Sequence, residues 1–234
     1  MNYILVPGAW AASWVWKEVA ANLTAQGHKV HALTLSGLGE GNGAKHVGLS
    51  THVDDVIEYL NSNNIRSAIL VGHSYSGIVI GMVAQKIPHR IAHTVFVEAF
   101  LPVKDRSLLD VSGLDVDDEL RAISVNDGLW PAPSGEELSN QPRLTDALVT
   151  LLNEKQKDHP GRTVSDTVWR EPHLGDLDAT FIAHEQWLAD SPLSELLAGL
   201  RKKPNWQFRA IDGGHWPMLT IPDDLARQLT DIAA

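Results

Sequence analysis

The chain has 234 residues, the length of one globular domain with a sizeable core. Its 44% hydrophobic and 21% charged residues exclude wholesale disorder and fibrous repeats. The formal net charge of -10 argues against a nucleic-acid partner, and the absence of cysteine excludes disulfides, thiolate metal ligands and a cysteine nucleophile. A small, neutral or apolar partner is favoured.

The first predicted elements are a buried strand and a helix. The apolar run Tyr3 to Val6 ends at Pro7-Gly8, which is typical of a short strand and too short for a membrane span. Because no basic segment precedes this run, we expect a cytoplasmic protein that does not contact membranes. A helix is predicted from Trp16 to Ala25, with Gly27 as its C-terminal cap, followed by a strand over 30–35.

Strands and helices then alternate along the chain. Glycine-rich residues 37–43 are predicted to form a loop at the rim of a pocket, because their spacing lacks the dinucleotide-binding pattern. Ser50 is expected to cap a helix over 51–60. Further strands are predicted at 67–71, 94–97, 179–183 and 207–211, and further helices at 77–85, 193–200 and 223–232. This alternation predicts an α/β fold in which helices cover both faces of a parallel sheet.

The alternation is interrupted by an acidic segment at 103–172 that is richer in proline and glycine. The best helical pattern inside it covers residues 144–155. We interpret the segment as an insertion and not as a second domain, with the core formed by residues 1–102 and 173–234.

The strongest local motif is Gly72-His73-Ser74-Tyr75-Ser76-Gly77, between a predicted strand and a helix of small residues. A sharp strand-to-helix turn holds a nucleophile in a strained backbone conformation, so the residues two positions away must be small. Gly72 and Ser76 meet this requirement, although glycine is usual where Ser76 stands. The motif therefore predicts a nucleophile elbow with Ser74 as the nucleophile.

A serine nucleophile needs a neighbouring base. Of the 11 histidines, His215 is distinguished by its place in a glycine-flanked turn directly after the last predicted strand. A base near the C-terminus fits the chain order serine, acid, histidine. We therefore expect His215 to be the base and His73 to be a packing residue of the elbow.

The oxyanion of a tetrahedral intermediate needs two fixed hydrogen-bond donors. One is expected to be the backbone N–H of Tyr75, the residue after the nucleophile. The other is expected in the loop after the first strand, where Ala9 is the candidate donor. Gly8 would allow the backbone of this loop to approach closely.

Four motifs together resemble the α/β-hydrolase superfamily, in the branch of plant hydroxynitrile lyases, methyl-salicylate-type methylesterases and their bacterial esterase relatives. They are Val6 to Trp10 with Trp14-Val15-Trp16, Gly72 to Gly77, Phe96 to Pro102, and Gly213 to Met218. The resemblance covers nearly the whole chain outside the insertion. It implies a hydrolase core with a six-stranded, mainly parallel sheet, in which residues 103–172 are a cap over the active site.

Departures from this branch bear on the reaction. Pro7 stands where a histidine is usual, which removes a side-chain contact. Lyases of the branch carry a threonine in the oxyanion loop and a lysine after the catalytic histidine, whereas this chain has Gly8 and Trp216. Cyanohydrin cleavage is therefore disfavoured, and ester hydrolysis is favoured.

The triad acid has three candidates. An acid that orients histidine must lie at the carboxyl end of a strand near the histidine loop. In the plant enzymes it follows the strand that corresponds to 179–183, where this chain offers Glu185 and Asp190 without the usual Thr-x-Asp pattern. Glu98 ends the strand after the nucleophile strand, a position that some hydrolases use. We prefer Glu98, with Asp190 and then Glu185 as alternatives.

The sequence thus predicts a cofactor-free serine esterase with a small-molecule ester substrate. Gly8, Trp130 and Trp216 are expected to contribute to the substrate pocket, with Trp169 and Trp187 as further aromatic candidates. No metal site is predicted. The sequence leaves open a homodimer and two other functions on the same fold, a small-ligand-binding receptor and a lyase or C–C bond-cleaving enzyme.

Overall fold

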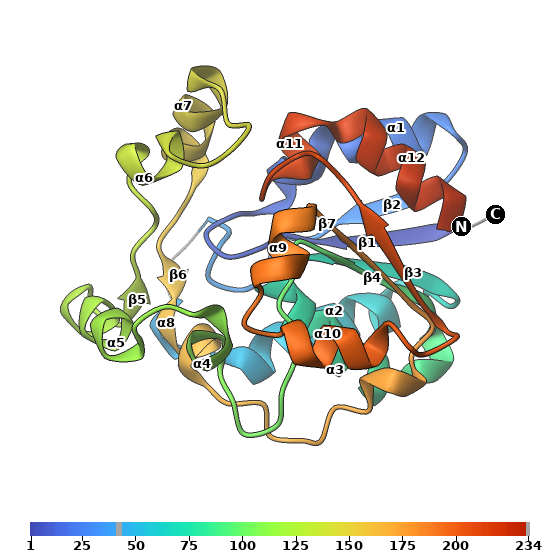
Figure 1. The fold of residues 1–234 in the computed structure, drawn as a ribbon, viewed down its shortest axis with the longest axis horizontal. Coiled ribbons are helices and arrows are strands. Elements are labelled where there is room, and N and C mark those ends of the chain that lie inside the picture. The colour runs from blue at the N-terminus through green and yellow to red at the C-terminus, as the bar shows by residue number, and fades with distance from the viewer. Residues whose placement is uncertain (41–43, 233–234) are drawn as a thin grey trace.

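A six-stranded sheet forms the centre of the computed structural model, which describes residues 1–40 and 44–232 (Figure 1). The strand order is β2-β1-β3-β4-β7-β8, and every neighbouring pair is parallel. The strands are β1 (Asn2–Val6), β2 (Lys29–Ala32), β3 (Ala68–His73), β4 (Ile91–Val97), β7 (Ala179–Ala183) and β8 (Trp206–Ala210). The predicted six-stranded α/β fold is confirmed, and its sheet is wholly parallel.

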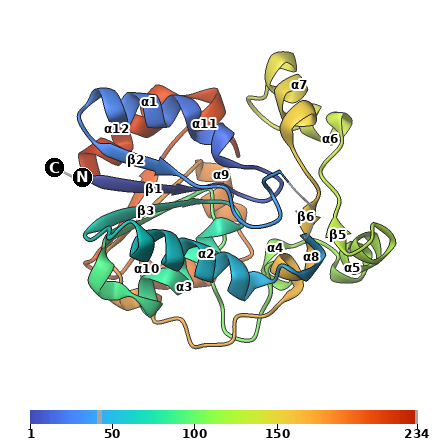
Figure 2. The ribbon, with the colours of Figure 1, turned by 180° about the vertical axis from the view of Figure 1, so that it is seen from behind.

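Helices cover both faces of the sheet (Figures 1 and 2). One face is covered by α1 (Lys17–Ala25), α11 (Pro217–Thr220) and α12 (Pro222–Ile232). The other is covered by α2 (Leu49–Ser62), α3 (Ser76–Lys86) and α10 (Ser194–Leu200), and the short α9 (Glu185–Asp190) follows β7. The carboxyl ends of the parallel strands therefore meet at one edge of a buried sheet, where α/β proteins place their sites.

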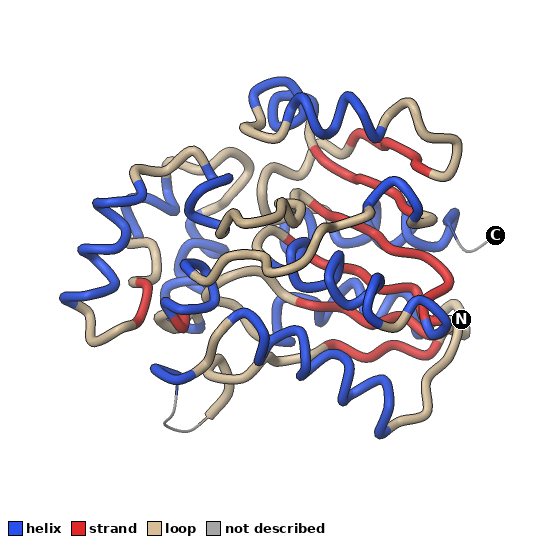
Figure 3. Tube along the Cα trace, turned by 90° about the horizontal axis from the view of Figure 1, so that it is seen from below, coloured by secondary structure: helices blue, strands red, loops and turns tan. Residues whose placement is uncertain are grey.

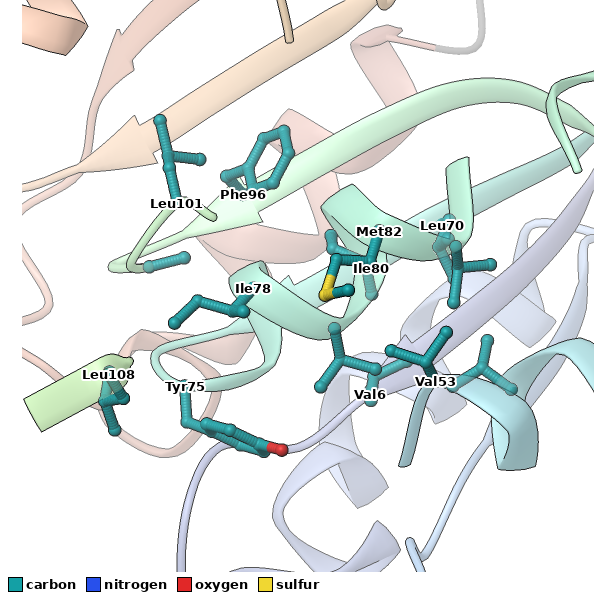
Figure 4. Packing of buried hydrophobic residues seen from close by; sticks show 14 of the residues in the cluster. Val6, Val53, Leu70, Tyr75, Ile78, Ile80, Met82, Phe96, Leu101 and Leu108 are labelled. Carbon is teal, nitrogen blue, oxygen red and sulfur yellow. The ribbon is translucent and has the colours of Figure 1, made fainter. Parts of the chain in front are cut away.

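The two faces of the sheet carry separate hydrophobic clusters, because successive residues of a strand point to opposite sides. In β1, Tyr3 and Leu5 belong to the cluster under α1 and α12, whereas Ile4 and Val6 belong to the cluster under α2 and α3. Figure 4 shows the second cluster, whose labelled side chains come from the strands, the loop after β4, α2, α3, the elbow and a helix of the insertion: Val6, Val53, Leu70, Tyr75, Ile78, Ile80, Met82, Phe96, Leu101 and Leu108.

Residues 103–172, called the cap segment below, form a lobe beside the end of the sheet where the strands finish (Figures 1 and 3). Its helices are α4 (Leu108–Ser112), α5 (Val116–Val125), α6 (Gly135–Ser139), α7 (Asp146–Lys155) and α8 (Gly161–Ser165). Two short strands, β5 (Leu129–Trp130) and β6 (His159–Pro160), pair antiparallel within it. The two ends of the segment are tied together, since the N–H of Asp105 donates to the Val168 carbonyl at 2.9 Å.

Some predicted boundaries were wrong. The helix predicted from residue 51 begins at Leu49, so Gly48 and not Ser50 precedes it, and the side chain of Leu49 is buried in the core. The strand predicted over 30–35 ends at Ala32, the last residue that pairs with β1. Residues 41–43 of the predicted rim loop lie outside the described residues. Among the residues that are described, no helix is long and apolar enough to cross a membrane.

Candidate active site

Ser74 lies at the turn between β3 and α3, with a φ of 52°. This left-handed conformation is rare for a residue with a side chain and places the serine at the tip of the turn. A Cβ on Gly72 would lie 2.8 Å from the Ser76 carbonyl oxygen, and one on Gly77 would lie 2.2 Å from that of Phe100. Both glycines are therefore required by close backbone approaches, as the predicted elbow demands.

Ser76, which departs from the usual glycine of the elbow, is fully buried. Its hydroxyl donates a hydrogen bond to the carbonyl of Pro7, in the loop after β1. A buried carbonyl without a partner would cost about 1–3 kcal/mol. The serine therefore ties the elbow to the predicted oxyanion loop, a link that glycine would not provide.

His215 lies in the loop between β8 and α11, and its Nε2 is 3.1 Å from the Oγ of Ser74. Gly214, next to it, has a φ of 63°, and a Cβ there would lie 2.5 Å from the carbonyl oxygen of Pro142 in the cap segment. Glycine at this position therefore allows both the turn and the close approach of the cap segment. The geometry places an imidazole within hydrogen-bond reach of the elbow serine, as a general base requires.

His73 holds the backbone of the loop that carries His215. Its buried ring donates from Nε2 to the backbone carbonyl of His215 at 2.7 Å. Burial, and then the nearby charge of His215, hold the pKa of His73 well below its ordinary value of 6.5. A neutral His73 with its proton on Nε2 is what this hydrogen bond needs, so its role is to position the loop, as predicted for a packing residue.

Glu98 follows β4 in the same way that Ser74 follows β3. Its φ is 48° and its side chain is 0% exposed, so the carboxylate must find its partners inside the protein. One oxygen, Oε1, accepts from the backbone N–H of His184 at 2.5 Å and from its Nδ1 at 2.8 Å. The other, Oε2, lies 3.9 Å from the Nδ1 of His215. The distance is longer than a hydrogen bond, a common feature of catalytic contacts before substrate binds.

The two alternative acids, Glu185 and Asp190, both lie in α9. Glu185 is exposed at the start of α9 and makes no ion pair within the described part of the chain. The side chain of Asp190 lies outside the described residues. Of the two candidates whose side chains the structure describes, Glu98 is the one that lies near His215.

The sequence interpretation missed His184. This residue directly follows β7, and β7 pairs with β4, the strand that Glu98 directly follows. Because neighbouring parallel strands end at the same edge, that register was the available signal, but strand pairing is not encoded in the local pattern around His184. The backbone and ring of His184 together hold the carboxylate that faces His215.

The predicted oxyanion donors lie beside the elbow. Ala9 and Tyr75 are both buried, and within residues 1–40 and 44–232 neither backbone N–H has a hydrogen-bond acceptor. A Cβ on Gly8 would lie 2.7 Å from the Nδ1 of His73 and 3.0 Å from the Cβ of Ser74. Gly8 therefore lets the loop pack directly against the elbow, and two free donors remain near the serine.

The side chain of Tyr75 is buried in the hydrophobic cluster of Figure 4. Its hydroxyl lies 3.0 Å from the Nδ1 of His52, whose Nε2 lies 2.8 Å from the Ser36 carbonyl. Since a carbonyl only accepts, His52 donates from Nε2 and accepts the tyrosine proton at Nδ1. Burial raises the pKa of Tyr75, so its hydroxyl stays protonated and fixes the residue that carries one predicted donor.

The aromatic pocket candidates fall into different places. Trp216 is buried against the rings of His73 and His215, and Trp130 is buried against Trp10. Trp169 is 47% exposed beside Met82, away from the serine. Trp187 packs on Phe100 and Phe181. A surface cavity of about 670 Å³ between residues 34–40, residues 44–47 and α2 contains none of the candidate site residues.

A family model described as the alpha/beta hydrolase family matches residues 3–228. The chain therefore belongs to the alpha/beta hydrolase family, and the predicted resemblance and hydrolase-class enzyme are confirmed. A carbendazim hydrolyzing esterase from Nocardioides sp. (strain SG-4G) is 29% identical over 97% of this chain and 98% of that protein. Salicylic acid-binding protein 2 from Nicotiana tabacum is 36% identical, but the match covers 43% of this chain and 40% of that protein.

Solved structures show the same fold. An extracellular alpha/beta-hydrolase from a Paenibacillus species superposes with a TM-score of 0.87 at 19% identity, covering 99% of this chain and 98% of that chain. A methylesterase from Arabidopsis superposes with a TM-score of 0.75 at 18% identity, covering 100% of this chain and 98% of that chain. At these identities the likeness concerns the arrangement of the elements and not the substrate.

Proposed function

We propose that this protein is a serine esterase that hydrolyses small carboxylic esters through an acyl-enzyme on Ser74. The observation that carries the proposal is the contact of 3.1 Å between the Ser74 Oγ and the Nε2 of His215, with the buried Glu98 carboxylate on the other side of the same ring. A nucleophile, a base and a group that orients the base are the parts that this chemistry requires.

In the first half-reaction, Ser74 Oγ attacks the ester carbonyl carbon while its proton passes to the Nε2 of His215. The carbonyl oxygen becomes an oxyanion, which the backbone N–H groups of Ala9 and Tyr75 stabilise. His215 then protonates the alcohol oxygen as the carbon–oxygen bond breaks. The alcohol leaves, and the acyl group stays on Ser74. Glu98 keeps the imidazole oriented and stabilises its charged form.

In the second half-reaction, water replaces the alcohol. His215 takes a proton from the water as the water oxygen attacks the acyl carbon, and the oxyanion forms in the same place. The bond to Ser74 then breaks, and His215 returns the proton to the Oγ. The products are a carboxylic acid and the free enzyme, so water is the single co-reactant and no cofactor takes part.

The substrate class follows from the relatives and from the protein's own residues. Several relatives are named methylesterases, and a grape relative is named a methyl jasmonate esterase. Trp216 packs against the ring of His215, and Trp130 packs against Trp10, the residue after Ala9, so both place apolar side chains next to residues of the proposed site. We propose small, uncharged or aromatic esters, methyl esters included, as substrates.

Turnover of a panel of para-nitrophenyl and methyl esters tests the proposal, with Ser74→Ala as the control. Loss of the nucleophile is expected to lower kcat by about 10⁴-fold or more. Full activity in Ser74→Ala would overturn the proposal. Binding of the ester without turnover by the native protein would favour a ligand receptor, and cleavage without a free acid product would favour a lyase.

A further inference from the structure

The loop that carries the Ala9 N–H is held by the cap segment through its next residue, Trp10. Trp10 has a φ of 62°, a left-handed conformation that is unfavourable for a bulky side chain and needs support from its surroundings. The residues on either side, Ala9 and Ala11, are small and buried and offer no polar side chain. The support therefore has to come from elsewhere in the chain.

The cap segment satisfies each polar group of Trp10. The backbone N–H donates to the Nδ1 of His159 at 3.2 Å, and the backbone carbonyl accepts from the N–H of Lys157 at 3.0 Å. The indole N–H donates to the carbonyl of Trp130 at 3.3 Å, and the centroids of the two indole rings lie 4.2 Å apart. The conformation of the loop beside Ser74 is thus fixed by residues about 120 to 150 positions away in sequence.

The two short strands of the cap segment present these contacts as a pair. Trp130 in β5 and His159 in β6 are cross-strand partners in the antiparallel pairing. Trp130 packs against the ring of Trp10 with the two ring planes tilted by 39°, and His159 accepts from the backbone of Trp10. Of these contacts, the one from His159 is the side-chain hydrogen bond to the backbone of the loop, so substitution can remove it selectively.

His159 is built to accept this hydrogen bond. It is 0% exposed, and its ring lies edge-on to the rings of Tyr75 and His52, with centroid distances of 5.0 Å and 5.7 Å. Burial, and then the charge of His52, hold its pKa well below 6.5, so the ring is neutral. A protonated ring would have no lone pair at Nδ1 for the N–H of Trp10. The neutral ring carries its proton on Nε2, which has no partner within the described part of the chain.

We propose that His159 is a positioning residue for the oxyanion hole. Its hydrogen bond holds the backbone at Trp10 and so aims the N–H of Ala9 at the oxyanion. This inference rests on the proposed function, because it assigns a residue to the same site. His159 does not touch the reacting atoms. It acts through the backbone of the loop, from a segment outside the hydrolase core.

The proposal predicts which kinetic constant changes. Negative charge on the carbonyl oxygen develops in the transition state, so a misplaced donor weakens binding of the transition state and not of the ester. Deleting an oxyanion donor costs about 10²- to 10³-fold in kcat, and releasing its loop is expected to cost less. Loss of the His159 contact should therefore lower kcat and kcat/KM equally.

The test compares His159→Asn with His159→Gln. An asparagine amide oxygen comes near the position of Nδ1 and can accept from Trp10, whereas the longer glutamine places its oxygen nearer the position of Nε2. We expect His159→Asn to keep kcat within about threefold of native and His159→Gln to lower it about 10- to 100-fold, with KM nearly constant in both. Asn126→Ala is the control for a loosened cap segment, since Asn126 bonds to Asp158 at 2.9 Å and does not touch Trp10.

A second readout separates positioning from stability. A trifluoromethyl ketone forms a tetrahedral adduct on the serine whose oxyanion occupies the hole, so its inhibition constant should rise in His159→Gln in proportion to the fall in kcat. Asn126→Ala should lower Tm and leave this inhibition constant near the native value. Equal kcat values in His159→Asn and His159→Gln, or a loss confined to KM, would overturn the role of His159.

Failure of the inference is distinguishable from failure of the proposed function. Native protein that hydrolyses the ester panel and is labelled on Ser74 by the ketone keeps the esterase proposal intact, whatever the His159 variants do. Native protein without ester turnover would refute the esterase proposal first, before any variant is compared.

Discussion

The two halves of the candidate site are held by different parts of the molecule. Ser74 and Glu98 directly follow β3 and β4, and His215 lies in the loop after β8. Their partners also lie at strand ends, since His73 is the last residue of β3 and His184 directly follows β7. The loop of Ala9 starts from a core strand as well, but its next residue is fixed by contacts from the cap segment. The proposed nucleophile, base and acid therefore depend on the sheet, whereas one proposed oxyanion donor also depends on the cap segment.

The sheet and the cap segment are therefore expected to contribute differently to catalysis. Strand ends of a buried parallel sheet are rigid, so they suit residues that exchange protons over short distances. The loop of the proposed donor Ala9 instead depends on contacts from the lobe formed by the cap segment. Substitutions in the core should therefore alter the proton-transfer machinery, and substitutions in β5 or β6 should alter stabilisation of the oxyanion.

Substitution of the acid is expected to give the largest effect on the core half. Glu98→Gln keeps the shape of the side chain but removes the charge that orients His215, and kcat should fall about 10³- to 10⁴-fold. Glu185→Gln is the matched control, because the side chain of Glu185 is exposed to solvent. Its kcat should stay near the native value. Steady-state kinetics on one para-nitrophenyl ester measures both, and a larger loss in Glu185→Gln would move the acid to α9.

Substitution of His184 should give a smaller effect on the same half. His184→Ala removes the ring donor at 2.8 Å from Oε1 of Glu98 but keeps the backbone donor. A hydrogen bond to a charged group is worth about 1.5–3 kcal/mol, so we expect kcat to fall roughly tenfold, with the remaining backbone bond holding part of the orientation. The pH–rate profile of kcat should shift along with it, because the carboxylate that faces His215 is less well held. An unchanged kcat and pH profile would limit His184 to packing.

The smallest effects concern stability and pH. Burial lowers the pKa values of His52, His73 and His159 below 6.5, most strongly for the last two. These rings take up protons more readily once unfolded, so the free energy of unfolding should fall as the pH drops below about 6.5, by up to about 1.4 kcal/mol per pH unit for each ring. Urea unfolding between pH 7.5 and 5 measures this slope.

The contribution of His159 to this pH dependence can be measured with His159→Asn. The variant lacks one buried histidine, so the slope should be shallower by up to about 1.4 kcal/mol per pH unit, whatever the absolute stability. His89→Asn is the matched control, because His89 is exposed on the surface. A slope that is equal in the native protein and His159→Asn would mean that His159 is not buried and neutral in the folded state.

The sequence allowed prediction of the core half because its signals are local. The elbow around Ser74 and the glycine turn around His215 combine a motif with an adjacent strand, and the structure brings these two residues within 3.1 Å. Glu98 needed a choice among three carboxylates, since strand pairing and burial decide which one faces the histidine. Those are long-range properties that no short pattern contains.

The cap half was not predictable in the same way. β5 and β6 have two residues each, which is too short for a periodic pattern, and His159 has no motif around it. Trp130 was expected to line the pocket, but a contact with Trp10 could not be read from either residue alone. Such contacts arise from the way an inserted segment packs back on the core, which depends on the whole fold.

Covalent labelling is the most direct test of whether Ser74 is the nucleophile. Native protein treated with a fluorophosphonate, and separately with a slowly hydrolysed ester, should gain one adduct by intact mass, located on the peptide that contains Ser74. Ser74→Ala should gain none, and Glu98→Gln should react more slowly. An adduct on another residue, or full ester turnover in protein that carries no adduct on Ser74, would show that Ser74 is not the nucleophile.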